Sequence, residues 1–262
     1  MSELLILSAE NVRTALPMDA CIDGMKQAYA ALSTGVAELP VRTSVAVPDQ
    51  EAVALFMPAR VGADLAIKVV SVFPRNVGRG EPLIYASVLV LDALSGAPLA
   101  LLEGGALTAI RTGAGGGASA DLLARRSAST VAMIGSGVQA RTGLAAICSV
   151  RKIDTVRVFS SHLAHAEQFC AEMAGRGPIP LNVKAVADVS AAVRGADIVY
   201  SATTAAQPTF DGRDLQAGAH VIGVGSYTPQ MQEVDAVTLR RALVVVDSRE
   251  AVLAEAGDLL VP

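Results

Sequence analysis

The chain of 262 residues has no tryptophan, few aromatic residues (3%) and few charged residues (18%). With so few aromatic side chains to stack on bases, we do not expect a surface for single-stranded nucleic acid. The net charge of −4 and the lack of a long basic run argue against any DNA or RNA partner. Uncharged apolar runs stay shorter than the roughly 18–20 residues of a membrane span, so we expect no membrane segment.

Signals for export and for metal binding are also missing. The start Met1–Leu4 has no basic residue and no cleavage pattern, so we expect no signal peptide. The three cysteines are far apart and form no CxxC pair, which indicates unpaired thiols in a reducing cytoplasm. His162 and His165 lie three residues apart, but no carboxylate or thiol accompanies them at ligand spacing, and we expect no metal site.

Hydrophobic residues make up 52% of the chain, enough for a large core, and the length suggests two domains. In the first part, apolar residues recur every three or four positions from Met18 to Leu32, which predicts a helix. Five segments with strand character follow, and Ser95-Gly96 between the last two predicts a hairpin turn. Strands joined by short turns predict an antiparallel or mixed sheet. The five segments are Val41–Val47, Leu55–Met57, Leu65–Phe73, Ile84–Leu91 and Leu99–Leu102.

From Thr130 onward, buried-type strands alternate with helices. This alternation predicts a parallel, doubly wound α/β sheet. We expect strands at Thr130–Ile134, Thr155–Phe159, Val183–Ala187, Ile198–Ser201, His220–Val224 and Ala242–Val246, and helices at Gln139–Ser149, Leu163–Ala174 and Ser190–Arg194.

An alanine-rich helix is expected between the two parts, over Leu107–Ala124, although it contains a cluster of four glycines within residues 113–117. Each glycine costs roughly 1 kcal/mol relative to alanine in a helix. Either the close approach of another backbone or a ligand, or tight helix–helix packing, would account for the cluster. We place the domain boundary here, with a first domain over residues 1–113 and a second over residues 114–262.

The segment Gly135-Ser136-Gly137-Val138-Gln139-Ala140 matches the GxGxxA motif between a strand and a helix. The first glycine permits a tight turn, and the second lets the backbone approach a pyrophosphate. The small third position allows close helix–strand packing, while the amino terminus of the helix attracts the anion. The motif in this setting predicts a dinucleotide-binding fold.

The end of the next strand bears on which dinucleotide is bound. Folds that prefer NAD usually place Asp or Glu there, on the ribose 2′-hydroxyl. This chain has Ser160-Ser161-His162 instead, whose hydroxyls and imidazole can hydrogen-bond a 2′-phosphate. The segment favours NADP(H), and the lack of an arginine at the same place leaves NAD(H) open.

Three cationic residues precede the dinucleotide motif. Lys68 interrupts an apolar strand, where an unpaired buried charge costs several kcal/mol, so we expect it to face a ligand, a carboxylate or water. Arg42 is expected to share a strand face with Ser44 and Ala46, and Arg111 lies just before the glycine cluster. Exposed or salt-bridged surface charges are the alternative interpretation for all three.

These residues resemble the ornithine cyclodeaminase and mu-crystallin family, and the similarity covers nearly the whole chain. The matching segments are Pro40-Val41-Arg42, Met57-Pro58-Ala59, Lys68-Val69-Val70-Ser71, Leu107-Thr108-Ala109-Ile110-Arg111-Thr112, the glycine motif and Gly257-Asp258-Leu259. The resemblance implies an NAD(P)-binding Rossmann domain and an α+β substrate domain with an open barrel-like mixed sheet, through which two chains form a homodimer. It also implies that Arg42, Lys68 and Arg111 surround a substrate carboxylate.

One loop position distinguishes the chemistries of this family. Its cyclodeaminases and alanine dehydrogenase carry a loop resembling Gly-x-Asp-x-Pro, whose Asp handles the substrate amine. This chain has Gly225-Ser226-Tyr227-Thr228-Pro229, and a neutral phenol offers the amine no carboxylate at neutral pH. A cyclic imine needs mainly a carboxylate clamp and a proton source, so the loop resembles that of the family's ketimine reductases. Packing of Tyr227 beside the nicotinamide is compatible with the same conclusion.

We therefore expect NAD(P)H-dependent reduction of Δ1-pyrroline-2-carboxylate to L-proline, and of the six-membered piperideine analogue to pipecolate. An ornithine cyclodeaminase, an amino-acid dehydrogenase and a non-catalytic NADP(H)-binding protein are the alternatives. Family chains continue past Gly257-Asp258-Leu259, so we expect this sequence, which ends at Pro262, to be either shortened or incomplete. The expected substrate residues are Arg42, Lys68, Arg111 and Tyr227, and the expected cofactor residues are Thr112, Gly135, Ser136, Gly137, Val138, Gln139, Ser160, Ser161, His162, Thr203, Val224, Gly225 and Ser226.

Overall fold

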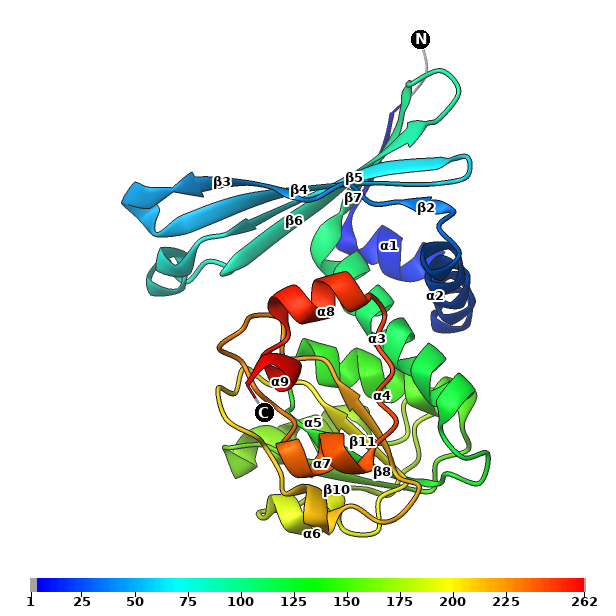
Figure 1. The fold of residues 1–262 in the computed structure, drawn as a ribbon, viewed down its shortest axis with the longest axis vertical. Helices are drawn as coiled ribbons and strands as arrows, with labels where there is room; N and C mark the ends of the chain where they lie inside the picture. Colours follow the sequence, from blue (N-terminus) through cyan, green and yellow to red (C-terminus); the bar gives the residue numbers. More distant parts are fainter. Residues whose placement is uncertain (1–3, 262) are drawn as a thin grey trace. The chain divides into compact units, whose positions relative to one another are not determined.

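The computed structural model describes residues 4–261 of the chain (Figure 1). Residues 1–3, on which the expectation of no signal peptide rests, and residue 262 lie outside the described part. The chain divides into two compact units, Met1–Ile110 and Arg111–Pro262. The division falls inside the long helix α3 (Gly104–Leu123), three residues before the expected boundary.

The first unit is built on a seven-stranded mixed sheet in the order β1-β7-β6-β5-β4-β2, with β3 also paired to β4 (Figure 1). β1 runs parallel to β7, and the other pairs are antiparallel. The sheet is open, since its outer strands do not pair with each other. Its strands are β1 (Leu5–Leu7), β2 (Ala37–Glu38), β3 (Thr43–Val47), β4 (Ala52–Val61), β5 (Asp64–Val72), β6 (Ile84–Asp92) and β7 (Pro98–Glu103).

The expected turn between β6 and β7 is present. Gly96 has φ +73°, a left-handed conformation that favours glycine. The Asp92 carboxylate accepts hydrogen bonds from the backbone N–H groups of Leu94 (2.9 Å) and Ser95 (2.7 Å), which closes the turn.

Two strand predictions in the first unit are corrected at their ends. β4 does not stop at Met57 but continues through Pro58 to Val61. β3 pairs with residues 52–56 and β2 with residues 60–61, so on that side of β4 Pro58 lies between the two pairings, and on the other side it is opposite Ile67 of β5. β3 begins at Thr43, so Arg42 lies just before the strand and does not share a strand face with Ser44.

The helices of the first unit are α1 (Ala9–Ala15) and α2 (Met18–Ser33). α2 is the helix that the spacing of apolar residues predicts. α1 was not predicted, although Ser8 and Asn11 form a capping box in which each side chain binds the other's backbone N–H.

The second unit contains a parallel sheet in the order β10-β9-β8-β11-β12. Val131 and Met133 of β8 pack against one hydrophobic cluster, and Ala132 and Ile134 against a second, so helices cover both faces. This arrangement confirms the predicted doubly wound α/β fold. Its strands are β8 (Thr130–Ile134), β9 (Thr155–Phe159), β10 (Val183–Ala185), β11 (Ile198–Ser201) and β12 (His220–Gly223), and its helices are the rest of α3, α4 (Val138–Val150), α5 (Leu163–Met173), α6 (Val189–Val193), α7 (Ala236–Arg241), α8 (Arg249–Glu255) and α9 (Gly257–Leu260).

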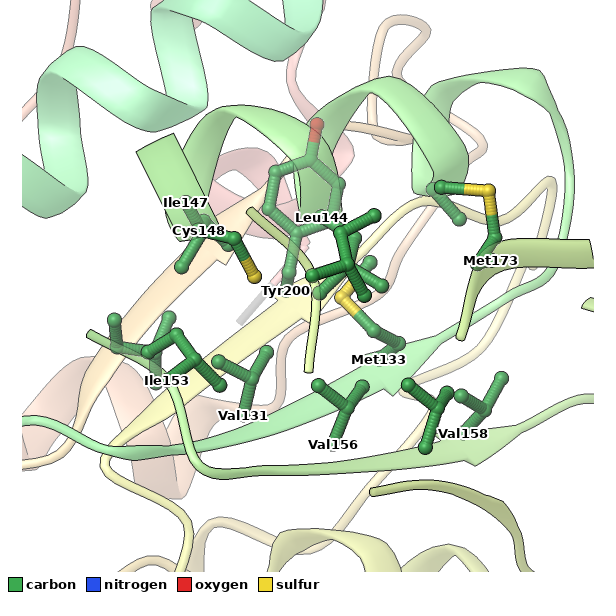
Figure 2. Packing of buried hydrophobic residues seen from close by; sticks show 14 of the residues in the cluster. Val131, Met133, Leu144, Ile147, Cys148, Ile153, Val156, Val158, Met173 and Tyr200 are labelled. Atoms are coloured by element: carbon green, nitrogen blue, oxygen red, sulfur yellow. The ribbon is translucent and has the colours of Figure 1, made fainter. Parts of the chain in front are cut away.

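Two glycines of the cluster in α3 are explained by packing inside the second unit. A Cβ on Gly113 would lie 2.6 Å from the Thr142 carbonyl of α4, and one on Gly116 would lie 2.6 Å from the Tyr200 ring. A Cβ on Gly143 of α4 would lie 2.2 Å from the same ring. The fully buried Tyr200 therefore fits between two glycines. Figure 2 shows Tyr200 rising from the sheet towards these helices. Tight packing therefore accounts for Gly113 and Gly116 of the cluster.

The predicted strand Ala242–Val246 is wrong. The segment forms no strand, and Leu243 is 90% exposed. β12 forms the edge of the described sheet, and the apolar run does not pair with its free side. An apolar composition predicts a buried strand only where a neighbouring strand accepts it.

Over residues 4–261 no helix is both long and apolar enough to cross a bilayer. The same residues contain no group of three His, Cys, Asp or Glu side chains placed to hold a metal ion. None of the three cysteines forms a disulfide, and burial raises the pKa of Cys148 to about 12, which makes this thiol a poor nucleophile.

Candidate functional site

The carboxyl ends of the strands in the second unit meet at one edge of the sheet. Ile134 of β8 is in register with Phe159 of β9 and with Ser201 of β11, which in turn is opposite Gly223 of β12. β8 lies at the point where the strand order reverses, since β9 pairs on one side of it and β11 on the other. Ligands of open α/β sheets bind in the crevice at such a point.

The glycine loop after β8 has the geometry that its motif predicts. Gly135 has φ +100°, and a Cβ there would lie 2.4 Å from the Ala202 carbonyl oxygen. Gly137 is the N-cap of the 13-residue helix α4, which no side chain caps, and a Cβ on Gly137 would meet no atom within 4 Å. Ala140 is fully buried against the sheet. The second glycine therefore leaves open space before uncapped N–H groups, which fits a pyrophosphate.

Arg141, directly after the motif, holds this loop in place. Its guanidinium donates hydrogen bonds to the Ser136 carbonyl and to the Glu172 carboxylate of α5, at 2.7 and 3.0 Å in the latter case. The hydrogen bond from Arg141 lowers the pKa of Glu172. The guanidinium also lies over the ring of Phe169, 5.3 Å from its centre. Sequence analysis missed Arg141, since its partner lies 31 positions away.

The end of β9 brings Ser160 beside the glycine loop. The Ser136 hydroxyl donates a hydrogen bond to the Ser160 hydroxyl at 3.3 Å. The Ser161 hydroxyl lies 3.2 Å from Nδ1 of the exposed His162, which is the N-cap of α5. Residues 160–162 contain no carboxylate that would repel a 2′-phosphate.

A buried carboxylate that sequence analysis missed joins the ends of β11 and β12. Glu233 is fully buried and accepts five hydrogen bonds, from side chains or backbone of Ser201, Thr203, Val224 and Gly225. A charged residue within the run Met-Gln-Glu-Val-Asp gives no sign of such burial, because its donors come from two other segments.

The Gly257-Asp258-Leu259 motif supports the same loops. Asp258 accepts hydrogen bonds from the backbone N–H groups of Glu233 (2.6 Å) and Val234 (2.9 Å), and the Asp258 N–H donates to the Ser226 hydroxyl. Burial, with the nearby charge of Glu233, raises the pKa of Asp258. Gly257 is required here because a Cβ would lie 2.1 Å from the Met231 carbonyl.

Tyr227 lies on the loop after β12. Its backbone N–H donates to the Gly225 carbonyl at 3.1 Å, and its side chain is 57% exposed. Gly225 is buried, and a Cβ there would lie 2.1 Å from the Thr203 carbonyl. The loop therefore presents its phenol outward while its glycine packs on the neighbouring strand end.

The predicted cations are spread over both units. Lys68 lies half-buried on β5, in register with Met57 and Val88, and Arg42 is exposed before β3 in the same unit. Arg111 is exposed at the start of the second unit, on α3, one residue before the half-buried Thr112. The structure thus brings together the glycine loop, Ser160, Thr203 and Val224–Ser226 within one unit, and the meeting of the three cations stays a prediction.

The model of the ornithine cyclodeaminase/mu-crystallin family matches residues 2–261. The chain belongs to this family. Δ1-Pyrroline-2-carboxylate reductase of Bacillus cereus is 38% identical over 262 residues, covering 99% of this chain and 80% of that protein. The match confirms the resemblance seen in the sequence motifs.

Two solved structures share the fold. The Δ1-pyrroline-2-carboxylate reductase of Thermococcus litoralis, in complex with NADH and L-proline, superposes with a TM-score of 0.91 at 38% identity, covering 99% of this chain and 80% of that one. A dimeric archaeal alanine dehydrogenase with bound NAD gives a TM-score of 0.88 at 27% identity, covering 96% of this chain and 76% of that one. The predicted combination of a Rossmann domain and an open mixed-sheet domain is therefore confirmed.

Proposed function

We propose that this protein is an NAD(P)H-dependent reductase of cyclic ketimine carboxylates, converting Δ1-pyrroline-2-carboxylate to L-proline. The observation that carries the proposal is the glycine loop before the uncapped N-terminus of α4, in a chain that is 38% identical to a reductase of this substrate. The six-membered piperideine analogue, with the same imine and carboxylate, is the second substrate.

The chain's own residues would hold the cofactor at the edge of the parallel sheet. Gly135–Gln139 receive the pyrophosphate, Ser160–His162 the adenosine ribose, and Thr203 and Val224–Ser226 the nicotinamide half. Thr112 of α3 is proposed as a further cofactor residue. When bound, the nicotinamide supplies the hydride.

On the substrate side, Arg42 and Arg111 bind the carboxylate of the imine, since a guanidinium holds a carboxylate through two parallel hydrogen bonds. Lys68 acts as a proton donor or a further carboxylate ligand. Its half-buried place on β5 supports this role, because a lysine there can be sheltered from water while it binds a carboxylate.

Tyr227 favours an imine over an amino acid as substrate. It stands where the family's amine-handling chemistries carry Asp, and it presents an exposed phenol in place of a carboxylate. At this loop position the chain therefore has no carboxylate to hold the amine of ornithine or alanine.

NADPH is the proposed cofactor in preference to NADH. The support is the segment Ser160-Ser161-His162, which has no carboxylate but has three side chains able to hydrogen-bond a 2′-phosphate. The NADH complex of the Thermococcus litoralis reductase shows that NADH is bound within the family, so the preference is one of degree.

We also propose a cytoplasmic homodimer formed through the first unit. The dimeric alanine dehydrogenase structure supports the assembly. Several apolar side chains of the first unit are at least half exposed, which suits a surface that a second copy covers. They are Leu5, Ile6, Val41 and Val45.

The direct test is the loss of reduced-nicotinamide absorbance with Δ1-pyrroline-2-carboxylate, comparing NADPH with NADH. Ornithine is assayed in parallel for ammonia release. Rapid oxidation with no ammonia supports the reductase, and the faster nucleotide tests the Ser160–His162 assignment. Ammonia release from ornithine would contradict the role given to Tyr227, and tight nucleotide binding without turnover would point to a binding protein.

A further inference from the structure

Glu233 is the one described side chain that joins the loops after β11 and β12 through both of its carboxylate oxygens. Oε1 accepts hydrogen bonds from the Ser201 hydroxyl (2.7 Å) and from the backbone N–H (2.6 Å) and hydroxyl (2.7 Å) of Thr203. Oε2 accepts from the backbone N–H groups of Val224 (3.2 Å) and Gly225 (2.5 Å). Oε1 thus binds the end of β11, and Oε2 binds the end of β12.

The two joined loops lie on one side of the strand β8. The glycine loop follows β8, and Ser160 follows β9 on the other side. If the glycine loop binds the pyrophosphate and Ser160 the adenosine side, the ends of β11 and β12 are left for the nicotinamide half. We propose that Glu233 is a positioning residue that holds these two loops in the arrangement that receives the nicotinamide half of the dinucleotide. This inference rests on the proposed function.

The carboxylate cannot be replaced by a group of the same shape. In a Glu233→Gln variant, an NH2 group takes the place of one oxygen. Turned one way it faces the N–H of Thr203, and turned the other way it faces the N–H groups of Val224 and Gly225. Either orientation sets donor against donor in a fully buried site, so at least one strand end must move.

A matched carboxylate lies at the opposite edge of the same sheet. Asp197, before β11, accepts hydrogen bonds from the backbone N–H groups of Ser129 (2.9 Å) and Thr130 (3.1 Å) and from the side chains of Arg125 and Gln216. Asp197→Asn therefore disturbs a comparable network away from the proposed cofactor edge, and serves as the control for a loss of stability alone.

The experiment measures the affinity of the full chain for two probes: the better-bound of NADH and NADPH, and the matching ADP-ribose fragment, which lacks the nicotinamide. We expect Glu233→Gln to weaken binding of the dinucleotide about tenfold and of the fragment by less than about twofold. Asp197→Asn lowers the melting temperature and leaves both affinities unchanged.

Equal losses for both probes, or no loss for either, would overturn the assignment of Glu233. If Glu233→Gln does not fold, Ser201→Ala removes a single donor and should weaken the dinucleotide alone, by about two- to threefold. No selective loss in that variant would also overturn it. A wild-type chain that binds neither probe would instead refute the proposed function itself, and this inference with it.

Discussion

At the scale of single residues, buried polar side chains in the second unit depend on particular partners. His220 of β12 lies 2.9 Å from the Ser119 hydroxyl of α3. Burial, together with the charge of Arg151, lowers the pKa of His220 from 6.5 to about 4. The folded chain therefore keeps this imidazole neutral at pH values where the unfolded chain protonates it.

This difference predicts an acid-dependent loss of stability. Below pH 6.5 the unfolded state binds a proton on His220, whereas the folded state binds it only near pH 4. The free energy of unfolding therefore falls as the pH is lowered from 6.5 to about 4, and His220 causes no such fall above pH 6.5. Urea unfolding at pH 7.5 and pH 4 should show a fall larger by on the order of 3 kcal/mol in the wild type than in His220→Gln. Equal falls in the two proteins would contradict a neutral buried His220.

The proposed substrate residues give a second prediction at this scale. Lys68→Ala and Arg111→Ala should each lower kcat/KM for Δ1-pyrroline-2-carboxylate by about a hundredfold. Each variant removes a positively charged side chain that binds the substrate carboxylate or donates a proton to the imine. Binding of the nucleotide, followed by fluorescence, should stay within about twofold of wild type.

Arg60 provides the control for these variants. It pairs with Glu38 at 3.0 Å on an exposed part of the first unit, so Arg60→Ala removes a cation without touching the proposed site. Its activity should match wild type. Full turnover in both Lys68→Ala and Arg111→Ala would remove the proposed substrate site.

At the scale of secondary structure, glycines in helices have opposite effects according to what surrounds them. A Cβ on Gly143 of α4 would meet the ring of the fully buried Tyr200, whereas a Cβ on Gly24 of α2 would meet no atom within 4 Å. Both are helix-interior positions, so alanine improves the helix propensity of each by roughly 1 kcal/mol.

Alanine substitutions should therefore change stability in opposite directions. Gly143→Ala should cost about 1–3 kcal/mol, because the new methyl group would lie 2.2 Å from Cζ of the fully buried Tyr200 ring. Gly24→Ala should stabilise by about 0.5–1 kcal/mol. Urea unfolding of both variants tests the pair, and a stabilising Gly143→Ala would show that Tyr200 is free to repack.

The elements that sequence could predict are those whose signal is local. The strand, glycine loop and helix around Gly135 are contiguous, so the motif located them correctly. The ends of β4 and the unpaired segment 242–246 depend on which neighbouring strands are available, and local composition does not report that. Arg141 and Glu233 were missed for the same reason, since their partners lie far along the chain.

At the scale of the whole molecule, the proposed dimer makes a prediction about mass. The chain has a mass of 26.8 kDa, and light scattering after size exclusion should give twice this value. Val45→Glu, on the half-exposed face of β3, should shift the protein towards the single-chain mass, because a charge at an apolar interface loses its hydration. A single-chain mass for the wild type would contradict the proposed assembly.

The parallel pairing of β1 with β7 has a consequence for synthesis. Leu5 is in register with Ala100, so the partner of the first strand is made 95 positions later. At about 5–20 residues per second, the ribosome needs roughly 5–20 seconds to supply it. During that interval the apolar strand β1 has no partner strand, and the first sheet is complete only once the hairpin of β6 and β7 has emerged.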